Sequence, residues 1–322
     1  MNLSLLRKNV QESLLLFIGC AGLVATFSFF RVWVVGRLDS GRFRQIIDLL
    51  PKDWERFSSV DFDWIVSYLG RTATTLDEPM LVMLVSAWAL VRGADVVGGE
   101  LGRGTMEMLL AQPVSRARIF WQQVLVNVLG VLALCLVCWL AMWLAVQTTQ
   151  IKETELPSIQ IPLTGIRIPI PNGEPKQILL PMRDVVSATS FAPGLGNLAC
   201  LGVFFVGMAS WLSSNDRYGW RATGIAVGVY FLFAMLKIGS AATPALAWMG
   251  WVTVFSLYEP ELHIQASQTD PQAIWHWTLV NHVSEKTVAG PLSSNLTLLI
   301  GGIAFAAFGA RIFGKRDLPA PS

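Results

Sequence analysis

The sequence predicts an all-α polytopic membrane protein with six transmembrane helices. Hydrophobic residues make up 53% of the 322 positions and charged residues only 14%, which is more apolar surface than one globular core of this length can bury. Long apolar stretches recur along the chain, and Lys and Arg are concentrated in the short segments between some of them. Together these observations indicate several bilayer crossings with a defined orientation.

A helix that crosses a bilayer needs about 20 mostly apolar residues. Six stretches meet this requirement, at about residues 14–35, 79–97, 121–146, 192–212, 220–238 and 292–313.

The charged side chains within these stretches include Arg31, Arg92, Asp95 and Lys237. Arg92 and Asp95 are one helical turn apart, so they can pair near the end of the second stretch, where a charge costs little. Arg31 can extend its head group toward the interface in the same way. We expect these charged side chains to lie at the ends of the helices. The alternative is that some of them line a central cavity.

The chain begins with a short amphipathic segment. Residues 2–11 place Leu3, Leu5, Leu6 and Val10 among polar positions, which predicts an N-terminal interfacial helix on the inner leaflet. Lys8 and FIGC at 17–20 resemble a lipoprotein signal, but the apolar run continues beyond Cys20. An uncleaved anchor is therefore favoured.

The distribution of Lys and Arg favours both termini in the cytoplasm. Basic residues are denser in the short segments that this orientation places inside than in the outer loops, residues 36–78, 147–191 and 239–291. The loop 36–78 is rich in basic residues, but it is also rich in acidic ones and long enough to be translocated.

The outer loops contain structure of their own. Residues 41–57 have helical spacing until Pro51 interrupts it, which predicts a surface amphipathic helix. Residues 151–181 alternate apolar and polar residues between prolines, which predicts extended or edge-strand structure. Residues 245–258 are apolar but too few to cross, so we expect a re-entrant or interfacial helix before the sixth span.

Cysteine and histidine usage argues against a redox or metal centre. All four cysteines lie in apolar runs, and the pair Cys135 and Cys138 is better explained as a lipid-facing or packing surface. The histidines lack the HExxH spacing of zinc proteases. A membrane-embedded metal-dependent hydrolase remains a minor alternative, with its site among Glu259, Glu261, His263 and His282.

The segment LGRGTMEMLLAQPVSR, from Leu101 to Arg116, carries a short helix signal between the second and third spans. Gly104 is a flexible joint and Thr105 a good N-cap, Pro113 ends the helix, and Ser115 can cap the next one. That next helix enters the membrane at Arg116. The apolar stripe of this short helix consists of Met106, Leu109 and Leu110.

Glu100 and Glu107 are expected to project away from this stripe. A helix of about two turns is not stable alone in water, so a partner must cover the stripe.

This pattern resembles the cytoplasmic coupling segment of type-2 ABC transporter permeases, many of which read E…GT.E.LL..PVSR at the same place. The close resemblance covers about residues 80–125, and RIFGKRDLPAP after the last span is a weaker likeness. One departure is Gln122–Gln123, where the family often has Gly-Lys.

The resemblance implies a single transmembrane permease domain over residues 1–322, in the cytoplasmic (inner) membrane of a prokaryote. It implies a cytoplasmic ABC ATPase subunit as partner, and a second permease subunit that makes a homodimer or a related heterodimer. Met106, Leu109 and Leu110 would fill a groove of the ATPase, and Pro113 would keep the coupling helix distinct from the third span. Surrounding polar contacts would come from Glu100, Arg103, Glu107 and Arg116.

ATP and magnesium would be bound by that ATPase, and no cofactor by this chain. Gly309–Lys315 matches the spacing of a phosphate-binding loop, but Arg316 stands where Ser or Thr must reach the metal, and the segment ends a span. Export coupled to ATP hydrolysis is the expected function. A non-transporting scaffold or channel is the main alternative, and the large outer loops point weakly to an extracytoplasmic partner. No basic run suggests nucleic acid.

Overall fold

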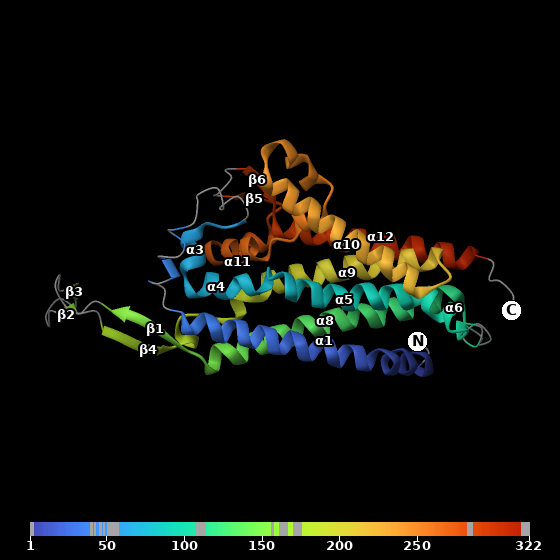
Figure 1. Ribbon diagram of the computed structural model, residues 1–322, viewed down its shortest axis with the longest axis horizontal. Coiled ribbons are helices and arrows are strands. Elements are labelled where there is room, and N and C mark those ends of the chain that lie inside the picture. Colours follow the sequence, from blue (N-terminus) through green and yellow to red (C-terminus); the bar gives the residue numbers. More distant parts are fainter. Residues whose placement is uncertain are drawn as a thin grey trace.

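The computed structural model describes residues 3–38, 41, 43–44, 47, 49, 58–106, 108, 114–155, 158–160, 167–169, 176–281 and 286–316. The long helices run along the length of an elongated molecule, and both chain ends lie at the same end of it (Figure 1). We call this the terminal end, where Leu3, Gly102 and Arg316 lie. The opposite end, where Arg37, Thr148 and strand β1(Gln150–Glu155) lie, is called the hairpin end.

Six helical segments in the described part of the chain are long and apolar enough to cross a membrane, which confirms the six predicted spans. Their bounds are Leu6–Arg37, Tyr68–Gly102, Arg116–Thr148, Ala188–Asn215, Gly219–Ala242 and Pro291–Lys315. All six extend beyond the predicted apolar stretches, because flanking residues continue each helix.

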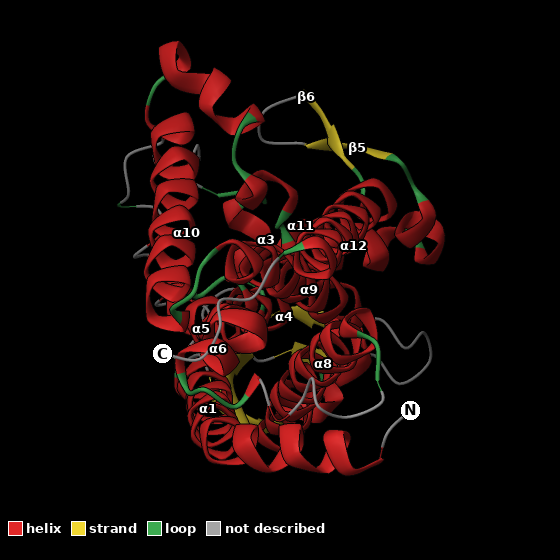
Figure 2. Cartoon of the chain, turned by 90° about the vertical axis from the view of Figure 1, so that its right-hand side faces the viewer, coloured by secondary structure: helices red, strands yellow, loops and turns green. Residues whose placement is uncertain are grey.

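The first span belongs to one continuous helix, α1(Leu3–Arg37). The sequence predicted a separate interfacial helix at residues 2–11, and the structure instead has one helix that runs without a break from Leu3 into the span. Figure 2, which looks along the bundle, shows the first turns of α1 running across the end of the bundle toward the N-terminus. The polar residues of this segment therefore reach the second span.

The second span is assembled from several short helices. α4(Tyr68–Ala73) is capped by the Ser67 hydroxyl and is followed by η2(Thr74–Leu76). α5(Pro79–Ala94) begins with proline, which suits a first turn that has no partner for its N–H. A π-helical turn, η3(Asp95–Gly99), and the single turn α6(Glu100–Gly102) complete it at the terminal end.

The remaining spans pack around α9(Ala192–Asn215), which is the most buried of the six. α12(Pro291–Lys315) crosses α9 at Gly207 and Gly302, where a Cβ on Gly207 would overlap the Gly302 backbone. Small residues of this kind permit close helix contact in membranes. α8(Arg116–Thr148) lies beside α1, and α10(Gly219–Ala242) stands at the edge of the bundle (Figure 2).

The predicted extended structure at residues 151–181 is confirmed for the strands that the structure describes. β1(Gln150–Glu155) pairs antiparallel with β4(Lys176–Pro181), and β2(Ser158–Gln160) with β3(Arg167–Pro169). The hairpin projects beyond the bundle (Figure 1). The predicted amphipathic helix at 41–57 lies largely outside the described residues.

After α10 the chain doubles back along that helix. η6(Pro244–Trp251) and η7(Val254–Leu257) replace the single predicted helix, and the Thr253 hydroxyl donates to the Phe233 carbonyl, 2.7 Å away. The re-entrant or interfacial position of this segment in the membrane stays a prediction.

α11(Pro260–Thr269), η8(Pro271–Trp275) and the hairpin β5(Thr278–Asn281)–β6(Lys286–Ala289) follow and lead into α12. Asn197 of α9 anchors this region: its amide donates to the Leu257 carbonyl and to Asn295 of α12, and its oxygen accepts from the Glu259 N–H.

The four cysteines are free and buried, so the packing explanation holds for Cys135 and Cys138. The four charged residues named from the sequence all have ion-pair partners. Arg31 pairs with Glu78 at 3.0 Å, Arg92 with Asp95 at 3.0 Å, and Lys237 with Glu259 at 2.9 Å. The predicted pairing of Arg92 with Asp95 is confirmed.

Candidate functional site

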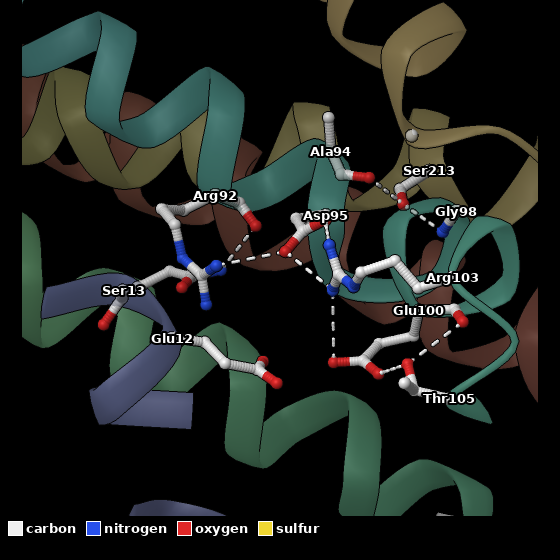
Figure 3. A network of polar contacts seen from close by, with 12 residues as sticks. Glu12, Ser13, Arg92, Ala94, Asp95, Gly98, Glu100, Arg103, Thr105 and Ser213 are labelled. Atoms are coloured by element: carbon white, nitrogen blue, oxygen red, sulfur yellow. Dashed lines mark hydrogen bonds and ion pairs between the residues drawn. The ribbon is translucent and has the colours of Figure 1, made fainter. Parts of the chain in front are cut away.

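The candidate site is a polar cluster at the terminal end, where the second span leads into the segment that joins it to α8. Six charged side chains meet there, three cations and three carboxylates: Lys8, Arg92, Arg103, Glu12, Asp95 and Glu100. They come from the first turns of α1 and from the end of the second span (Figure 3). The balance of charge matters because an unpaired charge at a buried position is strongly destabilising.

Glu100 is the most buried member, with a side chain 2% exposed. Its carboxylate accepts hydrogen bonds from Lys8 Nζ at 3.1 and 3.2 Å, and from the Thr105 hydroxyl, and it lies 3.4 Å from Arg103 Nη2. The Thr105 N–H also donates to the Glu100 carbonyl, 3.1 Å away. The sequence led us to expect Glu100 to project freely, and the structure places it among partners from its own chain.

Asp95 accepts from both arginines. Arg103 donates through Nη1 at 2.8 Å and Nη2 at 3.1 Å, in the two-pronged geometry that a guanidinium and a carboxylate favour, and Arg92 donates through Nη1 at 3.0 Å (Figure 3). The hydrogen bond to Asp95 raises the pKa of Arg103 above its ordinary value. Arg103 is thus held as a cation where the span ends.

The π-helical turn η3 positions these residues. A π turn widens the helix and leaves backbone groups that need other partners. Ser213 of α9 supplies them: its hydroxyl donates to the Ala94 carbonyl at 2.5 Å and accepts from the N–H groups of Val97 and Gly98 at 3.1 and 2.8 Å. Asn127 of α8 donates to the Arg92 carbonyl at 2.9 Å. Two neighbouring spans therefore hold the turn.

The start of α10 packs closely on the same turn. A Cβ on Gly219 would lie 2.9 Å from the backbone of Gly99, which is tighter than side-chain carbons tolerate. Beside this contact is a cavity of about 300 Å³, whose lining includes Asp95, Arg103 and Trp220. The end of the second span thus contacts α1, α8, α9 and α10.

The remaining predicted site residues differ in where the structure places them. Gly104 has a φ of 71°, a left-handed conformation that suits the predicted flexible joint. Met106 is 1% exposed and belongs to the hydrophobic core, so the protein itself covers it. Four others lie outside the described residues: Glu107, Leu109, Leu110 and Pro113.

Ser115 and Arg116 begin α8. Ser115 occupies the predicted N-cap position, but its side chain makes no capping hydrogen bond. Arg116 Nη1 donates to the Arg316 carbonyl, 2.7 Å away, at the end of α12. Arg116 thus ties α8 to the last span.

Sequence reasoning missed several residues of this site. Lys8, Asn127 and Ser213 contribute from other spans, and no local pattern connects them to the second span. Met108 also went unnoticed, and it is 68% exposed. Met108 lies between Met106 and Leu109 in the sequence, so it was not distinguished from the predicted apolar stripe.

The alternative hydrolase site is not assembled in the described part of the chain. No group of three or more His, Cys, Asp or Glu residues there lies close enough to hold a metal ion. His263 is buried, neither ring nitrogen has a hydrogen-bond partner, and burial lowers its pKa to about 4. His282 lies outside the described residues.

The segment that matched phosphate-binding loops, Gly309–Lys315, forms the last turns of α12. Gly309 packs against Phe120 and Trp211. A phosphate-binding loop links a strand to a helix, and this segment is helical throughout.

Comparison with known proteins agrees with this architecture. The family model described as ABC-2 family transporter protein matches residues 23–318, which is nearly the whole chain. A comparison with curated protein sequences finds no matching relative. With six apolar helices and this match, the chain belongs to the ABC-2 transporter family, as the membrane-spanning permease subunit of an ABC transporter.

Proposed function

We propose that this permease is an exporter driven by ATP hydrolysis in a separate ATPase subunit, and that the terminal end faces the cytoplasm and receives the ATPase. The ATPase binds ATP and magnesium, and this chain binds neither. A second permease subunit, identical or related, completes the translocation unit. The membrane is the cytoplasmic membrane of a prokaryote.

One observation carries the proposal: the polar cluster joins the segment after the second span to α1 and to the π turn. Glu100 contacts Thr105 on that segment and Lys8 on α1, while Asp95 holds Arg103. Hydrogen-bonded ionic contacts inside a packed structure hold their geometry well. A push on residues 103–106 would therefore displace α1 and the π turn along with it.

The surface of contact with the ATPase would be the segment from Arg103 to Arg116. Since Met106 is buried within the chain, Leu109 and Leu110 become the main candidates for the apolar contact, joined by the exposed Met108. Met side chains adapt well to binding surfaces. Glu107 and Arg103 would flank this contact.

The decisive experiment is copurification with the ATPase, combined with an assay of permease-stimulated ATP hydrolysis. We expect Leu110→Asp to abolish binding or stimulation while the protein still inserts in the membrane. Leu179→Asp is the matched control, because Leu179 is 60% exposed at the hairpin end. Unchanged stimulation by Leu110→Asp would contradict the proposal.

Orientation needs a separate test. Met108→Cys and Leu179→Cys place exposed thiols at opposite ends, and the four natural cysteines are buried. A membrane-impermeant maleimide added to intact cells should label Leu179→Cys and spare Met108→Cys. The reverse pattern would place the terminal end outside.

A scaffold or channel is the alternative, and the same copurification separates it from the permease. We do not expect an ABC ATPase to copurify with a scaffold or a channel.

A further inference from the structure

We propose that the groove between α1 and α8 binds an anionic phospholipid, with its headgroup at the hairpin end and one acyl chain along the two helices. This site lies at the opposite end from the polar cluster and does not depend on the proposed ATPase contact.

The headgroup would occupy a cavity of about 230 Å³ at the ends of the two helices. Its lining includes the cations Arg37 and Lys152, the hydroxyl residues Thr148 and Thr149, and Trp33. Among the described residues, neither Arg37 nor Lys152 forms an ion pair with a carboxylate. Two uncompensated cations beside hydroxyl groups suit a phosphate.

Thr149 gives further support. The residue is 4% exposed, and its hydroxyl oxygen is buried without a hydrogen-bond partner. A buried hydroxyl without a partner is unfavourable. A phosphate oxygen in the adjoining cavity could relieve this cost.

Arg37, which lines the cavity, stacks on an aromatic ring that is itself stacked on a second ring. Its guanidinium lies 4.9 Å from the centre of the Trp33 ring, and Trp33 stacks on Phe30 with ring centres 5.8 Å apart. Trp at a membrane interface and a cation over its face are both favourable. Phe30 also begins the apolar part of the site.

That apolar part is a groove of about 560 Å³, lined on α1 by Ala25, Thr26, Phe29 and Phe30, and on α8 by Val137, Leu140, Ala141 and Leu144. The groove and the cavity share one face of each helix. On α1, residues 26, 30, 33 and 37 are spaced four, three and four apart, and on α8 residues 137, 141, 144 and 148 repeat this spacing. Residues so spaced stack along one side of a helix.

The length of the site selects the occupant. From Ala25 to Arg37 the helix rises about 18 Å, close to half of the roughly 30 Å hydrocarbon core. One acyl chain of one leaflet has this reach.

Native mass spectrometry of the purified permease tests the proposal, with dioleoyl phosphatidylglycerol and dioleoyl phosphatidylcholine as probes. We expect the wild type to retain the anionic lipid about thirtyfold better than phosphatidylcholine, because the two basic residues each contribute about 1 kcal/mol to binding an anionic headgroup. The double variant Arg37→Gln/Lys152→Gln should lose this preference. Arg183→Gln is the matched control, since Arg183 is an exposed cation at the same end that does not line the cavity.

A second variant tests the groove. Thr26→Trp fills it while leaving both cations, and should reduce retention of both lipids. Elution of each variant at the wild-type volume in size-exclusion chromatography checks folding. Equal retention of the two lipids by the wild type, or an unchanged preference in the double variant, would overturn the proposal.

Two further outcomes point to other occupants. Displacement of the bound lipid by millimolar inorganic phosphate would assign the cavity to a free anion. Conversion of a dimer to a monomer by Thr26→Trp would assign the groove to a second copy. Either result contradicts the lipid site.

Discussion

Lys8 Nζ lies 3.1 Å from Glu100 Oε2, across 92 positions of sequence and between the first and second spans. The contact joins the bent start of α1 to the point where the second span ends. The Glu100 side chain is 2% exposed and the Lys8 side chain 30% exposed, so we expect the two residues to contribute unequally to the free energy of unfolding.

Replacing Glu100 should cost more stability than replacing Lys8. Glu100→Ala removes a buried carboxylate together with its contacts to Lys8, Arg103 and Thr105, and we expect it to lower the free energy of unfolding by about 3 kcal/mol. Lys8→Ala removes a partly exposed group and leaves Glu100 in contact with Arg103 and Thr105, so it should cost about 1 kcal/mol. Unfolding in mild detergent measures both values.

The exposed pair Arg44–Asp63 is the control for this comparison, since both side chains are more than half exposed. Asp63→Ala should change stability by about 0.5 kcal/mol or less. A loss from Glu100→Ala no larger than that from Asp63→Ala would contradict the central place of Glu100.

Ser213→Ala should weaken both the π turn and its coupling to α9. Three hydrogen bonds are lost and two backbone N–H groups lose their acceptor, which should cost about 2 kcal/mol. Ser210→Ala is the control, because Ser210 is equally buried on the same helix and its hydroxyl donates to the Val206 carbonyl of its own helix. Under the proposed function, Ser213→Ala also reduces permease-stimulated ATP hydrolysis, and Ser210→Ala does not. Equal effects of the two variants would refute this role.

Gly207→Ala should separate α9 from α12. The added carbon would overlap the backbone of Gly302, and overpacking of this kind costs about 2 kcal/mol. Gly196→Ala, on the same helix with nothing within 4 Å of its Cβ, should be neutral or stabilise by up to about 1 kcal/mol. Thermal unfolding of both variants measures the difference, and a neutral Gly207→Ala would mean that the helices cross elsewhere.

Stability should fall as the pH rises from about 4.5 to about 8, through Glu261. Burial raises the pKa of its carboxyl to about 8 from an ordinary value of 4.5, and the carboxylates of Asp77, Glu259 and Glu78 add to the shift while Arg31 opposes it. The folded protein therefore holds a proton in this pH range that the unfolded chain releases, so unfolding becomes easier at higher pH.

Glu261→Gln should remove this dependence and raise the midpoint of thermal unfolding at pH 8 relative to the wild type, while leaving it nearly unchanged at pH 5. The variant keeps the size of the side chain and cannot ionise. A midpoint that falls equally at both pH values would indicate a lost hydrogen bond instead.

The spans and the extended loop could be predicted from the sequence because their signals are local. Apolar runs of sufficient length define the helices, and the proline-interrupted alternation of residues 151–181 is visible without knowledge of the rest of the chain. The pairing of Arg92 with Asp95 was also predictable, since helical spacing alone brings them together.

The environment of Glu100 could not be predicted in this way. Its burial depends on Lys8, which arrives from a helix whose first turns cross the end of the bundle. The π turn likewise depends on Ser213, more than a hundred positions away. A polar residue beside a predicted loop appears solvent-exposed when only its neighbours in sequence are considered.

The separation of Lys8 from Glu100 also bears on biogenesis. The ribosome synthesises the first span long before Glu100, so Lys8 stays hydrated at the membrane surface until the second span has inserted. Insertion of individual helices and their later association are distinct stages for membrane proteins. Breaking this ion pair should therefore leave membrane insertion of the two helices unchanged. It should instead slow their later association, so that the protein matures more slowly and is degraded faster by membrane proteases.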